Sequence, residues 1–267
     1  MSQRFIILLS GLFLFLSQPL FSQIGLSVSP PRLYYQLKQG ETGTQKVMVS
    51  NVSNDHSMSL SLTFGDWKYD EYGNNLMLPP DSLNNSCTVW LTIPEGTYLT
   101  LEPGEQREID LNMTVPPEIN SQDNVQTAML YVTQMNSVYG TNAEGAAIKV
   151  NVRQGIKIYR SGGESETKNL EIEQLKFDRD KNSLVLVFKN QGNIWINGEV
   201  TSGLFNQTTG EELALEETVF YTLPYDHRTM FIPIGRTLEK GEYVATVVLD
   251  YGEDTTLEAA ELQFSHE

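Results

Sequence analysis

The sequence predicts an all-β protein of two β-sandwich domains, and three observations lead to this prediction. Apolar and polar residues alternate with period two through most of the chain, as in strands with one buried face. Almost no stretch has the 3.6-residue period of an amphipathic helix. A segment rich in glycine and charge, 161–169, divides the chain, and the strand pattern restarts after it.

The N-terminal residues predict a secretory signal peptide over 1–22. Arg4 precedes an apolar run that ends near Leu16, and small and polar residues follow, with cleavage expected near Ser22. The alternative is a membrane anchor, but the apolar run is short for a membrane span of about 20 residues. We therefore expect the mature protein to be exported.

The first half of the chain has the strand pattern of one sandwich, expected over 23–160. Met58, Leu60, Leu62 and Phe64, for example, share one face of a strand. Turn residues separate the strands, with a Pro-Gly turn within 101–106 and polar segments at 116–124 and 136–145. The expected strands are 44–54, 57–67, 108–115, 127–135 and a long one, 145–160. The last is unusual because strands of about five or six residues are the norm.

The second half, 170–267, repeats this organisation after the linker at 161–169. A short stretch, "LVFKNQGN" (186–193), resembles "VMVSNVSN" (47–54), since both run from an apolar strand into Asn, one residue, Ser or Gly, and Asn. Two sandwiches with the same early turn would explain the repeat, as would convergence on common turn chemistry. The expected strands are 170–177, 183–190, 199–206, 229–235, 242–252 and 257–264.

The composition limits the partners. The chain has 18 Lys+Arg against 34 Asp+Glu, a formal net charge of −16. Such a protein is repelled by nucleic acid and by anionic membrane surfaces. The single cysteine, Cys87, cannot form an internal disulfide. It is either a reactive thiol, a link between chains, or a small apolar residue.

No motif for catalysis or metal binding occurs in the sequence. His56, His227 and His266 lie in polar, turn-like stretches or at the C-terminus. The stretch "DRDKNS" (178–183) begins like a calcium loop, but Ser183 replaces the glycine of its sixth position and a lysine its twelfth-position glutamate. We expect a turn there, and we expect a protein without enzymatic activity, cofactor or metal.

Several motifs occur in the order found in the periplasmic chaperones of chaperone–usher pilus assembly, the PapD-like family, which this sequence resembles. The resemblance is good over 26–160 and thin over 165–267. It implies two immunoglobulin-like domains in an L-shaped arrangement. The motifs are "SPPRLYY" (29–35), "VMVSN" (47–51), "LEPGEQREIDL" (101–111), "AMLYV" (128–132), "AIKVNVRQGIKIYR" (147–160) and "LDYG" (249–252).

The resemblance implies a function as well. Such a chaperone lends a strand to a pilus or fimbrial subunit with an incomplete immunoglobulin fold, grips the subunit's C-terminal carboxylate, and passes it to an outer-membrane usher. An exposed sheet edge would also allow a self-capping dimer. The implied site residues are Ile148, Val150 and Val152 in the donor strand, Arg32 and Lys157 as the carboxylate anchor, and Arg160 with Asp250 as an interdomain ion pair.

Alternatives remain open at these positions. One residue of the family pattern is missing after Lys157; if the gap falls before the lysine, Ile156 takes the anchor position. The three donor residues would face this protein's own core in an ordinary sandwich. Other functions that fit the composition are a non-enzymatic envelope binding or structural protein, and carbohydrate binding by Trp67, Trp90 and Trp195.

Overall fold

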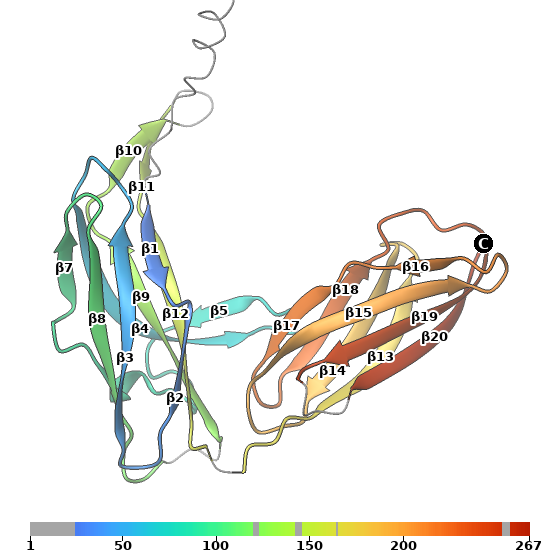
Figure 1. The fold of residues 1–267 in the computed structure, drawn as a ribbon, viewed down its shortest axis with the longest axis horizontal. Helices are drawn as coiled ribbons and strands as arrows, with labels where there is room; N and C mark the ends of the chain where they lie inside the picture. The colour runs from blue at the N-terminus through green and yellow to red at the C-terminus, as the bar shows by residue number, and fades with distance from the viewer. Residues whose placement is uncertain (1–24, 120–122, 142–145, 164, 253–256) are drawn as a thin grey trace, which may run out of the picture.

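The chain forms two immunoglobulin-like β-sandwiches set at an angle in an L, which confirms the predicted fold class (Figure 1). The structure is a computed structural model that describes residues 25–119, 123–141, 146–163, 165–252 and 257–267. The expected signal peptide, 1–22, lies outside these residues. Within them, one short 3₁₀ helix, η1 (Thr88–Trp90), accompanies the strands, and none of the helical structure has the length and apolarity of a membrane span.

The first sandwich packs two sheets face to face. One sheet has the order β1-β3-β8-β6, and the other has the order β2-β12-β9-β4-β5 with β7 also paired to β4. The strands of the first sheet are β1 (Leu26–Ser29), β3 (Thr42–Asn51), β8 (Gln106–Thr114) and β6 (Leu91–Thr92). Those of the second are β2 (Arg32–Gln36), β12 (Arg153–Ser161), β9 (Val125–Gln134), β4 (Met58–Tyr69), β5 (Asn75–Leu78) and β7 (Tyr98–Leu101).

The N-terminal strand changes sheets at a pair of prolines. β1 pairs with β3 in one sheet, whereas β2 pairs in parallel with β12 in the other. Pro30 and Pro31 lie between them. Proline lacks the N–H that a strand needs for its ladder, so neither residue can continue the pairing of β1. Arg32 therefore becomes the first residue of a strand in the second sheet.

The long strand predicted over 145–160 is two strands. β11 (Ala147–Val150) pairs with β10 (Val138–Thr141), which lies in a segment predicted as loop, and β12 pairs with β9. The interruption falls at Asn151 and Val152, where the partner strand changes from β10 to β9. The β10–β11 hairpin projects beyond the body of the sandwich (Figure 1).

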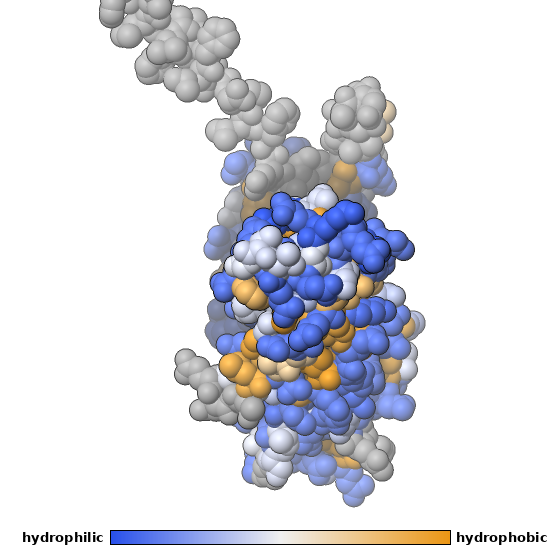
Figure 2. All heavy atoms as spheres, turned by 90° about the vertical axis from the view of Figure 1, so that its right-hand side faces the viewer, coloured by the Kyte–Doolittle hydropathy of each residue, from blue (hydrophilic) through white to orange (hydrophobic). Residues whose placement is uncertain are grey.

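The second sandwich begins at Leu170. One sheet is β13 (Leu170–Asp178), β14 (Ser183–Asn190) and β18 (His227–Pro233). The other has the order β16-β15-β19-β20, with β17 also paired to β15. Its strands are β15 (Ile196–Asn206), β16 (Glu212–Ala214), β17 (Thr218–Thr222), β19 (Gly241–Asp250) and β20 (Glu258–His266). Seen from the side of this domain, the surface is mostly hydrophilic, with apolar side chains gathered in places (Figure 2).

The buried apolar side chains form three clusters. Each sandwich has its own apolar core between its sheets, and Cys87 is a buried free thiol in the first. The third group, here called the junction cluster, draws residues from both domains. β9 is buried on nearly every residue because the first core covers one face and the junction cluster contributes to the other. The buried members of the junction cluster are Trp67, Tyr69, Val125, Met129, Tyr131, Tyr159, Ile194 and Leu223, with Trp195 and Tyr221 packed against them.

The internal repeat corresponds to the same hydrogen-bonding device in both domains. Asn51 ends β3 and Asn190 ends β14, and both side chains are buried. Each Oδ1 accepts the backbone N–H two residues later, at 3.0 Å from Ser53 and 2.8 Å from Gly192. Each Nδ2 donates to carbonyls of its own turn and of another loop. The turn is therefore tied to a loop distant in sequence.

We expect Asn51→Ala to destabilise the first domain by about 2–4 kcal/mol, because buried carbonyls left without a donor cost roughly 1–3 kcal/mol each. Urea unfolding followed by circular dichroism measures the change. Asn54→Ala, at an exposed position of the same turn, is the matched control. An equal loss of stability in both variants would contradict the role given to the Asn51 network.

Candidate functional site

Arg32 and Lys157 lie side by side at the junction of the two domains. Lys157 of β12 is the parallel register partner of Arg32 of β2, and its N–H donates to the Pro31 carbonyl at 3.1 Å. Register partners on neighbouring strands project to the same face of a sheet. Here that face carries the junction cluster, since Tyr34 and Tyr159, the partners two residues further on, stack with ring centroids 5.0 Å apart.

Lys157 is held by aromatic rings. Its Nζ lies 4.3 Å from the centroid of Trp67 and 4.2 Å from that of Tyr69, and it donates a hydrogen bond of 2.9 Å to the Tyr69 hydroxyl. Trp67 is itself fixed by a hydrogen bond from Nε1 to the Ala128 carbonyl, at 2.8 Å. Cation–π contacts of this kind contribute about 0.5–2 kcal/mol each. The ammonium is therefore oriented by neutral groups.

Arg32 is held in a similar way from the other domain. Its Cζ lies 4.1 Å from the centroid of the Tyr221 ring, which belongs to β17. Its Nε is buried and has no hydrogen-bond partner in the part of the chain that the structure describes. A buried donor without a partner costs free energy. Among the described residues, Arg32 is therefore held by a ring contact and keeps its charge uncompensated.

A third cation, Arg228 of β18, contacts both domains at the junction. Its side chain is 2% exposed and lies 4.3 Å above the centroid of Tyr69. It donates to the carbonyls of Tyr221, at 2.9 and 2.7 Å, and of Asp70 in the first domain. The next residue, Thr229, donates its N–H to the Glu71 carbonyl at 2.7 Å. The turn between β4 and β5 is thereby fixed to β18 (Figure 1).

The three cations outnumber their counterions. Asp226 pairs with Arg228 at 3.3 Å, while no carboxylate in the described ranges forms an ion pair with Arg32 or Lys157. Burial, and then the positive charges of Arg32 and Arg228, lower the pKa of Lys157 to about 8. This combination favours a ligand that brings negative charge and accepts hydrogen bonds, as a carboxylate does.

A sheet edge without a strand partner leads away from these cations. On one side, β12 pairs with β9 along its whole length and β11 pairs with β10. On the other side, β2 pairs only from Lys157 to Ser161. Over 147–150 and 153–156, no described strand forms a ladder with that second edge. Such an edge presents backbone N–H and C=O groups to another extended chain.

The predicted donor residues differ in their surroundings. Val152 is half-buried and packs against the first core, as the alternative interpretation expected. Val150 is also half-buried, but it does not belong to that core among the described contacts. The backbone of Ile148 pairs with Gly140 in the projecting hairpin. Ile156, the alternative anchor, is 1% exposed in the core, so Lys157 is the residue of the two that faces the junction.

The expected ion pair between Arg160 and Asp250 is replaced by other contacts. Arg160 is buried within the first domain, where it donates to the Leu37 carbonyl and, at 2.7 Å, to the side-chain oxygen Oε1 of Gln126. Asp250 is exposed at the end of β19 and accepts the N–H of Gly252. Arg160 therefore bonds to uncharged groups of its own domain, and the arginine that contacts both domains is Arg228.

Several residues of the site have no local signal in the sequence. Arg228 follows a polar, turn-like stretch, and nothing in the sequence around Tyr69 and Tyr221 separates them from aromatics of a sandwich core. The tryptophans proposed for carbohydrate binding are not exposed platforms: Trp67 and Trp195 belong to the junction cluster, and Trp90 packs against the first core. The described residues contain no group of three His, Cys, Asp or Glu side chains that could hold a metal.

No family model and no curated protein matches the sequence. Solved structures are similar at low identity. The YadV chaperone shares 12% identity with a TM-score of 0.48, over 90% of this chain and 99% of its own. The class 5 fimbriae chaperone CfaA gives 12% and 0.45, over 90% and 98%. A chain of the Salmonella enterica SafA pilin complex with the SafB chaperone gives 13% and 0.47, over 90% and 97%. Likeness at this identity concerns the fold.

The low pKa of Lys157 predicts a specific pH dependence of stability. The folded pKa of about 8 is below the usual lysine pKa of 10.5, so between these pH values the unfolded chain binds more protons and the free energy of unfolding rises with pH. Below pH 8 the buried charge weakens the fold to its full extent. Relative to Lys157→Met, the parent protein should therefore gain stability from about pH 8 to pH 10.5.

Urea unfolding across that range measures the difference. Lys68→Met, at an exposed position of β4, is the matched control and should parallel the parent at every pH. Parallel curves for the parent and Lys157→Met would contradict the shifted pKa.

Replacing Arg228 should loosen the angle between the domains. Arg228→Gln removes the donors to Asp70 and the contact with Tyr69, so we expect a larger radius of gyration in small-angle X-ray scattering. Arg236→Gln, at an exposed arginine paired with Glu211, is the control and should leave the scattering curve unchanged. An unchanged curve for Arg228→Gln would assign the domain angle to other contacts.

Proposed function

We propose that this protein is a periplasmic chaperone that binds pilus or fimbrial subunits by donor-strand complementation. In this proposal Arg32 and Lys157 hold the subunit's C-terminal carboxylate, and the edge of β11 and β12 pairs with the subunit's last strand. The carrying observation is the pair of cations without a carboxylate partner next to a sheet edge without a strand partner. No catalytic step is part of the proposal.

The charges favour a carboxylate over other ligands. A bound carboxylate would bring negative charge to Arg32 and Lys157, which have no carboxylate partner among the described residues, and would restore the charge balance there. Hydrogen bonds in which one group is charged contribute about 1.5–3 kcal/mol each. A terminal carboxylate also ends its chain, so it fits a site where β2 begins to occupy the edge of β12.

The geometry of the edge sets the length of the partner strand. Ile148 lies nine residues before Lys157, which corresponds to roughly 30 Å at about 3.3 Å per residue. A subunit strand that runs parallel to β11 and β12, with its carboxylate at Lys157, would place about its last nine residues along this edge. Its register would be fixed from the carboxylate end, because a one-residue slip reverses every side chain.

The donor residues would act by completing an apolar surface of the subunit. Ile148 and Val150 belong to β11, in the hairpin that projects beyond the first sandwich (Figure 1). Burial of each such side chain is worth about 1.5–3 kcal/mol. Val152, which already packs against the first core, would contribute less new burial and would mark the end of the donated segment.

The expected signal peptide and the acidic surface agree with work in the periplasm. Delivery of the subunit to an outer-membrane usher, and a dimer that caps the free edge when no subunit is bound, complete the proposal. Both would use the same edge of β11 and β12, since an unpaired edge tends to associate with another strand.

The test is co-purification of a subunit with the tagged protein from periplasm, beside Arg32→Ala and Lys157→Ala. Loss of one charged hydrogen-bond donor should weaken binding about tenfold or more, at about 1.4 kcal/mol per factor of ten. Lys168→Ala, an exposed lysine of the segment between the sandwiches, is the control.

A subunit extended at its C-terminus by several residues provides the complementary test. The extension moves the carboxylate away from Arg32 and Lys157, so binding should fall to the level of the anchor variants. Equal binding of the extended subunit would assign recognition to another surface. Failure of every subunit to bind the parent would favour a structural role in the cell envelope.

A further inference from the structure

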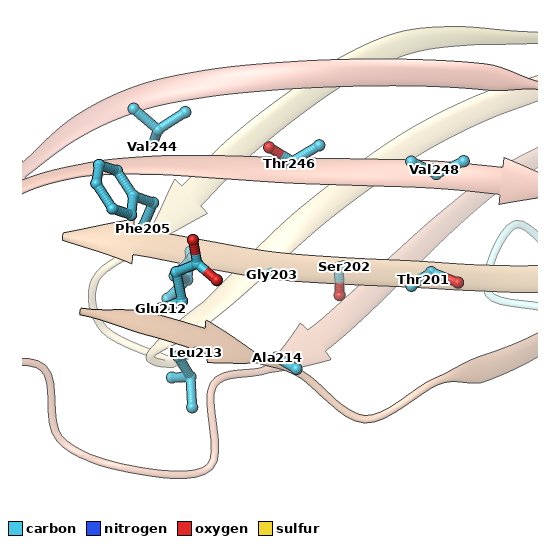
Figure 3. A pocket seen from close by; sticks show the side chains of 11 residues that line it. Thr201, Ser202, Gly203, Phe205, Glu212, Leu213, Ala214, Val244, Thr246 and Val248 are labelled. Atoms are coloured by element: carbon cyan, nitrogen blue, oxygen red, sulfur yellow. The ribbon is translucent and has the colours of Figure 1, made fainter. Parts of the chain in front are cut away.

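The outer face of the larger sheet of the second domain carries a depression that plays no part in the proposed anchor. Its volume is about 400 Å³, at the small end of the roughly 300–1,000 Å³ of ligand pockets. It opens over β15, β16 and β19, on the side of the sheet opposite the second core (Figure 3). The depression and its surroundings are here called the outer β-face.

The register of the strands defines which residues share the outer β-face. Val200, Leu204, Ala245, Val247 and Leu249 point into the second core. Their neighbours along the strands therefore point outward. The outward rows are Glu212, Phe205, Val244 and Gln263; then Ala214, Gly203, Thr246 and Glu261; then Thr201, Val248 and Ala259.

The centre of this face is apolar and hollowed at a glycine. Phe205 is 41% exposed, and Val244 and Val248 are partly exposed beside it. Between them lies Gly203, where an added Cβ would meet only the Leu213 carbonyl, at 3.3 Å. The missing side chain makes room for one from outside. A solvent-facing sheet surface usually carries polar residues at such positions.

The charge of the sheet is of one sign. Its strands β15, β16, β17, β19 and β20 hold six carboxylates and neither lysine nor arginine, and of these Glu212 and Glu261 lie at the ends of the outward rows. The six are Glu199, Glu212, Glu242, Asp250, Glu258 and Glu261. An apolar centre with an acidic rim complements a segment with an apolar side chain between lysines or arginines.

We propose that the outer β-face binds a partner protein through a segment of alternating basic and apolar residues, with one apolar side chain seated over Gly203. A second copy of this chain is the less suitable occupant, because its net charge of −16 and its own acidic rim would be repelled. An anionic membrane is unsuitable for the same reason. This site is independent of Arg32 and Lys157, which lie at the junction of the domains.

The probe is an acetylated and amidated peptide in which lysine alternates with valine and phenylalanine. The amide removes the carboxylate that the Arg32 and Lys157 pair would attract. One control peptide has glutamate in place of lysine, and a second has serine in place of the apolar residues. Binding to the full chain is followed by fluorescence anisotropy, and backbone NMR shifts locate it. We expect saturable binding of the probe alone, with shifts on β15 and β19.

Gly203→Val fills the depression from the outward side, and valine suits a strand, although its Cβ would press on the Leu213 carbonyl at 3.3 Å, so β16 must shift slightly. It should weaken the probe's binding about tenfold, which corresponds to about 1.4 kcal/mol. Glu261→Lys should weaken it about two- to fivefold, as expected for an exposed ion pair of up to about 1 kcal/mol. Thr63→Val, at an exposed position of β4 in the first domain, is the matched control.

Three results would overturn the proposal. The first is the absence of saturable binding by the parent protein. The second is binding that Gly203→Val leaves unchanged while the variant keeps the parent's melting temperature, because the peptide then occupies another edge or face. The third is a concentration-dependent dimer in sedimentation velocity that Gly203→Val abolishes, since the occupant would then be a second copy.

Discussion

The parallel pairing of β2 with the end of β12 is the constraint on which the candidate site depends. It sets Arg32 beside Lys157 and Tyr34 beside Tyr159. The two prolines before Arg32 end the first strand in one sheet and direct the chain into the other. Because β2 covers the edge of β12 only from Lys157 onward, the same pairing decides where the free edge begins. The position of the Arg32 and Lys157 pair and the start of the unpaired edge of β12 thus both follow from the change of sheet between β1 and β2.

Positive charge at the junction is stabilised mainly by aromatic rings. Lys157, Arg32 and Arg228 all lie over tyrosine or tryptophan rings, and Asp226 is the carboxylate that pairs with one of them. Rings hold cations in place without cancelling their charge. A carboxylate from the chain itself would have stabilised the junction further, but it would have occupied the hydrogen bonds that a ligand needs. Burial, together with the charges of Arg32 and Arg228, accordingly lowers the pKa of Lys157.

Much of the fold could be predicted from the sequence, because alternation reports the buried face of each strand. The turn at 178–183 and the repeated asparagine turn correspond to features of the structure. Short strands such as β1, β5 and β10 were not recognised separately, since four residues carry little periodicity. The break at Asn151 was missed because the alternation continues across it, although the pairing partner changes from β10 to β9.

The site was less accessible to sequence reasoning than the fold. Arg32 and Lys157 came from the family resemblance, and their juxtaposition depends on pairing between strands about 125 residues apart, which no local pattern encodes. The expected pair of Arg160 and Asp250 does not form, because Arg160 is buried in the first domain on Leu37 and Gln126 while Asp250 is exposed at the end of β19. Arg228 links the domains by donating to the backbone carbonyls of Tyr221 and Asp70. No sequence motif predicts such contacts, because every residue has a carbonyl.

Electrostatics connects the two surfaces inferred for this molecule. The junction is a local region of positive charge in a protein whose net charge is −16. At physiological ionic strength charges are screened over about 8 Å, so a carboxylate responds to the junction only when it is close. At longer range an acidic protein attracts basic partners and repels acidic ones. A basic segment would therefore be attracted to the acidic outer β-face from a distance, whereas a carboxylate would respond to the aromatic-held cations only at close range.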